Sequence, residues 1–154
     1  MKKSKKLTIV AASIIAVITV IGFWGYSHHK KQMAKEALIK AEIAMNDSLS
    51  KDISKLQTEA DVKYQNGNKH GEGYEQEYID AYLCLSNAIL SAKKMTKSDI
   101  NITGLTNKRD SVKKALIVAK EELEGKASYF ADSGMEDIAE EFRNRSNKIS
   151  NVIK

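Results

Sequence analysis

The sequence predicts an all-α protein in which one N-terminal transmembrane helix precedes a soluble bundle of about four helices. Three observations lead to this prediction. The chain of 154 residues contains no Pro, the residue least compatible with the interior of a helix. Beyond residue 37, apolar residues recur at intervals of three and four, which is the spacing of one face of a helix. No stretch alternates apolar and polar residues for long enough to build a sheet.

The transmembrane helix is predicted from a run of twenty uncharged residues, Leu7 to Tyr26. At about 1.5 Å per helical residue, this run covers about 30 Å, the thickness of the hydrocarbon core of a bilayer. It ends in Phe23, Trp24 and Tyr26, and aromatic rings prefer the headgroup boundary. We therefore expect an uncleaved signal anchor. Cleavage after Gly25-Tyr26-Ser27, which would release a secreted protein, stays open as the alternative.

The flanking charges predict the orientation of this anchor. Lys residues at positions 2, 3, 5 and 6 precede the run, and Lys30, Lys31 and Lys35 follow it. The excess before the run favours a cytoplasmic N-terminus. We expect residues 1–6 in the cytoplasm, residues 7–26 in a bacterial inner (cell) membrane, and residues 27–154 in the periplasm or outside the cell.

The net charge of +5 belongs mainly to the anchor. All 20 Asp and Glu and 21 of the 25 Lys and Arg lie after residue 26, so the soluble part carries about +1. The basic pI is a topology signal, and we expect no nucleic-acid partner.

The soluble part divides into four expected helices. The first carries an apolar stripe from Leu38 to Tyr64, with a potential break at residues 46–48, where Asn, Asp and Ser favour caps. A Gly-rich loop over residues 66–73 separates it from a helix over about 74–95. A polar stretch follows, then a helix over about 106–131. Ser133 and Glu136 form an expected capping box that starts a last helix. Its expected inward residues are Ile138, Ala139, Phe142, Ile149 and Ile153.

Two places resemble tetratricopeptide-type helical hairpins. The first match comprises Tyr78, Ala81, Leu85 and Ala88, and the second comprises Ala127, Phe130, Gly134 and Ala139. The resemblance covers about half of the soluble part, and any two packed antiparallel helices favour small residues where they cross. It implies a surface that binds a protein or a peptide. In layout alone, a short basic start, one span and a helical remainder, the chain is also similar to the inner-membrane subunit of phage spanins.

The sequence lacks the motifs of common catalytic and cofactor sites. It has no Gly-x-Ser-x-Gly, no phosphate-binding Gly-rich motif, no Cys-x-x-Cys-His and no paired Glu-x-x-His. We therefore expect no enzymatic activity, no cofactor and no metal. His70, in the Gly-rich loop near Glu72 and Glu75, is the one conceivable metal ligand. Cys84 is alone and is expected to pack as a small apolar residue, with an intermolecular disulfide as the alternative.

Tyr74, Tyr78 and Tyr82 are spaced by four and form the candidate partner-binding site. Packing between helices, with the hydroxyls at the rim, is the alternative. The leading hypothesis is a non-enzymatic, membrane-anchored, extracytoplasmic protein-interaction domain, an adaptor or a subunit of an envelope complex. Its partner would be another envelope protein, and homo-oligomers stay open. The alternatives are a bundle-type sensor or ligand-binding domain, and a spanin-like membrane-disrupting phage protein.

Overall fold

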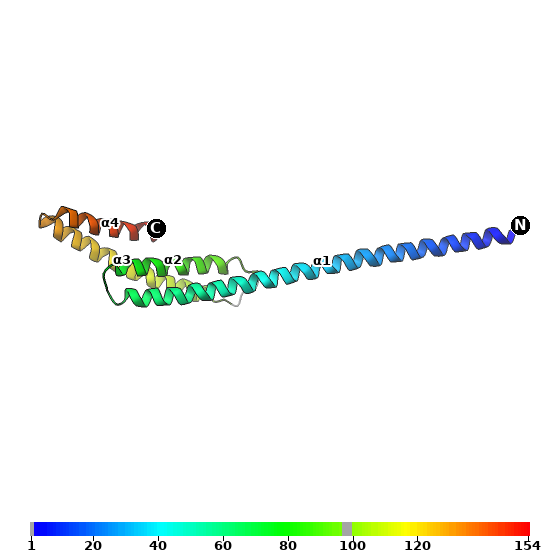
Figure 1. Cartoon of the computed structure of the whole chain (residues 1–154), viewed down its shortest axis with the longest axis horizontal. Helices are drawn as coiled ribbons and strands as arrows, with labels where there is room; N and C mark the ends of the chain where they lie inside the picture. Colours follow the sequence, from blue (N-terminus) through cyan, green and yellow to red (C-terminus); the bar gives the residue numbers. More distant parts are fainter. Residues whose placement is uncertain (1, 97–99) are drawn as a thin grey trace. The chain divides into compact units, whose positions relative to one another are not determined.

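The computed structural model describes residues 2–96 and 100–154, with side chains from Tyr26 onward. The described residues are all-helical, as predicted, with four helices (Figure 1). These are α1 (Lys2–Gly67), α2 (Tyr74–Ala92), α3 (Ile102–Asp132) and α4 (Glu136–Val152). The chain divides into an N-terminal unit that ends at Ala44 and a compact unit, Met45–Lys154.

The described side chains of the N-terminal unit, residues 26–44, belong to α1 and are almost all exposed. They include the large apolar residues Met33, Leu38, Ile39 and Ile43. Where side chains are described, no helix combines the length and apolar character needed to cross a membrane. The predicted span, Leu7 to Tyr26, lies outside those residues except for Tyr26. The predicted division into residues 1–6, 7–26 and 27–154 stays a prediction.

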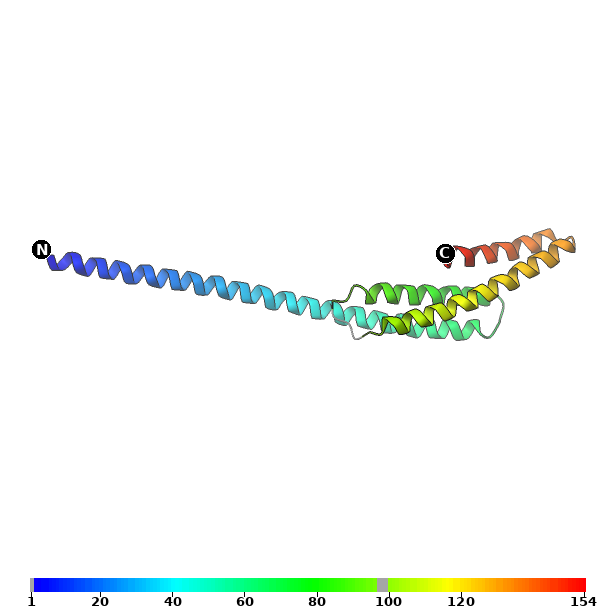
Figure 2. The same cartoon turned by 180° about the vertical axis from the view of Figure 1, so that it is seen from behind.

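The compact unit is a bundle in which the end of α1, α2 and the first part of α3 lie side by side (Figures 1 and 2). α4 runs back along the second part of α3, which extends beyond the other two helices. The core is formed by apolar residues at the predicted three- and four-residue spacing, and many are small enough for close helix approach. Its fully buried members include Ile53, Ala81, Leu85, Ala88, Leu105, Leu116, Ala119, Leu123 and Ile149.

α1 has no break at residues 46–48, so that prediction is wrong. Asn46 instead donates a hydrogen bond from Nδ2 to Thr96 Oγ1, 3.1 Å away, across the end of the bundle. The predicted stripe is buried at Ile53 and Ala60, whereas Leu38 and Met45 are exposed. Helical spacing alone does not reveal where the packing partners of a long helix end.

The boundaries of the other helices differ from the predictions in physically simple ways. α2 starts at Tyr74 as expected, after Gly73 at φ 71°. α3 starts at Ile102, four residues early, because the Asn101 side chain accepts a hydrogen bond from Gly104 N–H. Ser133 does not cap α4, and the predicted capping box is wrong. Its hydroxyl donates back to Tyr129 O and it closes α3.

α4 begins after Met135 without a side-chain cap. Its inward residues match the prediction at Ala139 and Ile149, which are fully buried, while Ile138 is exposed. Gly134 adopts φ 77°, and the N–H groups of Gly134 and Met135 donate to Ala131 O and Phe130 O. This pair of bonds is a Schellman motif, which joins two helices tightly and requires a residue that tolerates positive φ.

Candidate functional site

The predicted partner-binding residues, Tyr74, Tyr78 and Tyr82, lie on successive turns of α2 at different depths. Tyr74 and Tyr78 are 8% and 4% exposed, and Tyr82 is half-buried. The rings of Tyr74 and Tyr78 meet edge to face with centroids 5.9 Å apart, and Tyr64 of α1 lies 5.6 Å from Tyr78. Packing between helices, the alternative left open, accounts for Tyr74 and Tyr78. Partner binding by the three rings stays a prediction.

The hydroxyls of the two buried tyrosines, Tyr74 and Tyr78, donate hydrogen bonds to other residues of the chain. Tyr74 donates to Glu122 Oε2 of α3 at 2.5 Å, and Tyr78 donates to Asn68 Oδ1 at 2.8 Å. Burial, and then the Glu122 carboxylate, raise the pKa of Tyr74, and burial raises the pKa of Tyr78. Both hydroxyls therefore stay protonated donors, which tie α2 to α3 and to the turn after α1.

The residues with potential metal or redox chemistry are not gathered into a site. His70 sits in the turn at φ 48°, with its ring 4.7 Å from that of Tyr74. Among the residues that the structure describes, no three His, Cys, Asp or Glu are placed to hold a metal ion. Cys84 is half-buried on α2, and burial raises the pKa of its thiol, which keeps it protonated and weakly nucleophilic.

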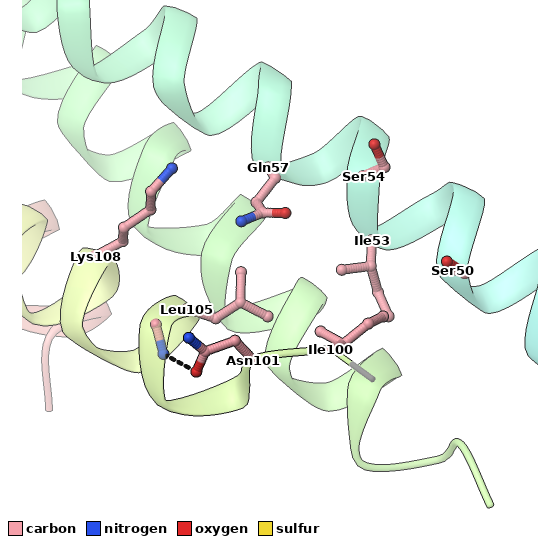
Figure 3. A pocket seen from close by; sticks show the side chains of 9 residues that line it. Ser50, Ile53, Ser54, Gln57, Ile100, Asn101, Leu105 and Lys108 are labelled. Carbon is pink, nitrogen blue, oxygen red and sulfur yellow. Dashed lines mark hydrogen bonds between the residues drawn. The ribbon is translucent and has the colours of Figure 1, made fainter. Parts of the chain in front are cut away.

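A hollow of about 410 Å³ lies between α1 and the start of α3 (Figure 3). Ile53 and Ile100 point toward each other at one end, and Leu105 lies farther along (Figure 3). Uncharged polar residues form much of the remaining lining, namely Ser50, Ser54, Gln57 and Asn101. Apolar and uncharged polar residues thus line most of the hollow, and Lys108 is the charged residue in its lining.

A second hollow of about 210 Å³ lies farther along α1 and α3 and is also lined by Leu85 of α2. Its lining includes Ala60, Tyr64 and Val112, and it shares Lys108 with the first hollow. We call the two hollows together the α1–α3 groove. Because residues 50–53 of α1 face the start of α3 and residues 60–64 face the next turns, α1 and α3 run parallel along it.

Lys108 and Asp61 are the charged side chains among the lining residues of the α1–α3 groove, and they pair with each other. Lys108 Nζ lies 2.9 Å from Asp61 Oδ2, and both side chains are about half exposed. An exposed pair of this kind contributes at most about 1 kcal/mol. The pair spans the groove, and little free energy is needed to separate its two side chains.

One buried ion pair was not predicted from the sequence, because its two residues are 70 positions apart. Glu75 of α2 is 5% exposed and binds Arg145 of α4 through both carboxylate oxygens. Burial is the largest influence on the pKa of Glu75 and raises it. Hydrogen bonds from Arg145 and from its own backbone N–H, with the charge of Arg145, outweigh burial and leave that pKa below its usual value. The pair joins α2 to α4, and neither residue lines the α1–α3 groove.

No protein-family model, no curated protein and no solved structure matches the chain. The tetratricopeptide resemblance therefore stays a prediction.

Proposed function

We propose that this protein is a membrane-anchored, extracytoplasmic helical domain that binds another envelope protein, as an adaptor or as a subunit of a complex. The anchor is supported by the uncharged run Leu7 to Tyr26, its aromatic end and the four Lys before it. The orientation is supported by the same charges. Protein binding is supported by the α1–α3 groove, the observation that carries this proposal.

The composition of the α1–α3 groove suits a protein segment. Charged residues make up 29% of the chain, yet the groove offers a single, mutually paired cation and anion. Depletion of charged residues distinguishes the centre of an interface from ordinary surface. From Ser50 to Tyr64 the groove follows fifteen residues of α1, about 20 Å at the rise of a helix. This length accommodates about four turns of a partner helix.

A partner helix would enter the groove with short apolar side chains at three- and four-residue spacing. Ile53, Leu105 and Val112 line the hollows but are almost fully buried, so such side chains would touch only the atoms of these residues that reach the hollows. Hydroxyl and amide groups of Ser50, Ser54 and Gln57 would bind polar atoms at the edges. Parting Lys108 from Asp61 would cost little because both are already half solvated.

Site-specific photo-crosslinking of the full-length protein in the membranes of its own cells tests this proposal. A photoreactive residue at Ser54 should form an adduct with another protein. The same residue at Val62, which is exposed on α1 and does not line the groove, should not. Absence of an adduct from Ser54 in carbonate-washed membranes that retain the protein would contradict binding through the groove.

A matched pair of substitutions tests the same point. Ser54→Arg places a long charged side chain in the groove, and Val62→Arg adds the same charge at an exposed site outside it. Both positions are exposed, so the fold should be retained. Co-purification of the partner in mild detergent should be lost with Ser54→Arg and kept with Val62→Arg. Recovery of the chain in the carbonate supernatant would contradict the anchor, independently of the groove.

A further inference from the structure

The turn between α3 and α4 presents large apolar side chains to solvent. Tyr129 is 68% exposed, Met135 49% and Ile138 40%. We call these three residues the tip. It lies at the end of the compact unit opposite the α2–α3 connection (Figures 1 and 2).

Backbone hydrogen bonds and aromatic contacts hold the turn that carries the tip. The Schellman bonds from Gly134 and Met135 hold the turn. Phe130, next to Tyr129 in the chain, stacks its ring on that of Phe142 with centroids 5.5 Å apart and planes within 7°. Tyr129 meets Phe130 edge-on at 5.3 Å. Binding of a partner would therefore cost little conformational entropy in this turn.

The segment that carries the tip is acidic. Residues 126–143 contain five Asp and Glu and two Lys and Arg, a net charge of −3. Glu136 is paired with Arg143. Asp132, Asp137 and Glu140 are exposed and have no ion-pair partner within the part of the chain that the structure describes. The same segment therefore offers a partner both carboxylates without an ion pair and exposed apolar surface.

We propose that the tip is a second interaction surface, which binds a Lys- and Arg-rich segment of a partner protein that also carries an apolar anchor residue. The partner's cations would pair with Asp132, Asp137 and Glu140, and its apolar side chain would pack on Tyr129 and Met135. An anionic membrane surface is disfavoured because the carboxylates would be repelled from it. This surface lies at the end of α3 and on α4, away from the α1–α3 groove at the start of α3, and it uses other residues and other chemistry. It does not depend on that groove being occupied.

Three synthetic peptides test the chemistry on the full-length protein in lipid nanodiscs. They are fluorescent twelve-residue peptides of Lys and Leu, of Lys and Gln, and of Glu and Leu. Anisotropy titration should show the tightest binding for Lys/Leu, with weaker binding for Lys/Gln and none for Glu/Leu. Equal affinities for Lys/Leu and Lys/Gln would overturn the apolar part of the proposal, and binding of Glu/Leu would overturn the charge part.

Variants then locate the binding. Tyr129→Ser should weaken Lys/Leu binding about tenfold, and the double variant Asp137→Asn, Glu140→Gln should weaken it several-fold and reduce its salt dependence. The controls are Val118→Ser, an exposed apolar residue elsewhere on α3, and Asp52→Asn with Glu59→Gln, exposed carboxylates on α1. All these side chains are exposed, so melting temperatures should match the wild type. Equal losses in the controls would overturn the proposal.

Crosslinking in cells separates this proposal from the previous one. A photoreactive residue at Met135 should yield an adduct whose attachment point, mapped by mass spectrometry, lies in a Lys- and Arg-rich segment of another protein. An adduct with a second copy of this chain would overturn the proposal. An adduct from Ser54 but not from Met135 would overturn the tip alone. Adducts from neither would overturn both.

Discussion

Arg145 of α4 donates two hydrogen bonds to the Glu75 carboxylate of α2, with Nε 2.6 Å from Oε1 and Nη2 2.9 Å from Oε2. The guanidinium also lies 5.5 Å from the centre of the Phe142 ring. Both side chains are largely withdrawn from water, and two-point Arg–carboxylate pairs hold their geometry better than single contacts. This pair fixes α4 against α2, and through α4 it fixes the α3–α4 hairpin that carries the tip.

Removing one member of this pair should be strongly destabilising. Arg145→Met leaves the buried Glu75 carboxylate without its cation, which should lower the free energy of unfolding by about 3 kcal/mol. The control is Arg143→Met, two residues away on α4, where the paired side chains are mostly exposed and the loss should stay below about 1 kcal/mol. Urea unfolding in mild detergent, followed by circular dichroism, measures both. Equal losses would show that the Glu75 pair contributes no more than a surface pair.

The pair should also make stability depend on acidity. The pKa of Glu75 in the folded chain is below its ordinary value of 4.5, so folding favours the ionised form. The resulting stabilisation is complete above pH of about 4.5 and is lost as pH falls through the folded-state pKa. Melting temperatures between pH 6 and pH 3 should therefore fall more steeply for the wild type than for Glu75→Gln.

The control for this pH dependence is Glu124→Gln. Lys120 and then Ser146 lower the pKa of the Glu124 carboxyl, but this group is exposed. Solvent screening should therefore make its effect on the slope small. A wild-type slope unchanged by Glu75→Gln would contradict the assignment.

Two glycines should respond oppositely to substitution by Ala. A Cβ at Gly67 would stand 2.5 Å from Tyr78 Cε1, and this ring is buried and held through its hydroxyl by Asn68. Gly67→Ala should cost about 1–3 kcal/mol. At Gly125, inside α3, a Cβ would enter open space, so Gly125→Ala should gain about 0.5–1 kcal/mol from reduced backbone entropy. Thermal unfolding of the two variants checks the signs, and a shared sign would refute the steric argument.

The start of α3 depends on one side chain. Asn101 Oδ1 accepts from Gly104 N–H at 2.8 Å, so Asn101→Ala should cost about 1 kcal/mol, and Asn101→Asp should restore most of it. Asn107→Ala, at an exposed position within α3, should be neutral or slightly stabilising. Chemical denaturation compares the three variants. A loss that Asp does not rescue would point to the groove lining rather than to the cap.

Local sequence patterns correctly predicted the features that depend on residues close together in the chain. The start of α2 at Tyr74 and the burial of Leu85 and Leu116 follow from helical periodicity. The patterns were misleading where distant contacts or turn geometry decide the outcome. Residues 46–48 resemble a break, but α1 continues through them, and Asn46 bonds to a residue 50 positions later. At Ser133 two local motifs competed, and the positive φ available to Gly134 favoured a helix end over a capping box.

The candidate sites were predicted less well than the fold. Tyr spacing on α2 identified a real cluster, but spacing does not distinguish an exposed patch from the core that buries Tyr74 and Tyr78. The α1–α3 groove joins residues about 50 positions apart, and its mostly uncharged lining has no signature in either segment alone. The acidic residues near Glu136 were visible in the sequence. The apolar tip that they surround required the turn geometry.

The end of α2, which is followed by the exposed Lys93 and Lys94, and the turn between α3 and α4, which carries the exposed Asp132 and Asp137, lie at opposite ends of the compact unit (Figure 1). The field of each group of charges reaches about 8 Å, the screening length at physiological salt, and so acts before surfaces touch. A basic protein that diffuses past would be turned toward Tyr129, while an acidic one would be turned toward Lys93 and Lys94. Charge would then decide which end of the compact unit a partner approaches, before the shapes of the two surfaces are tested.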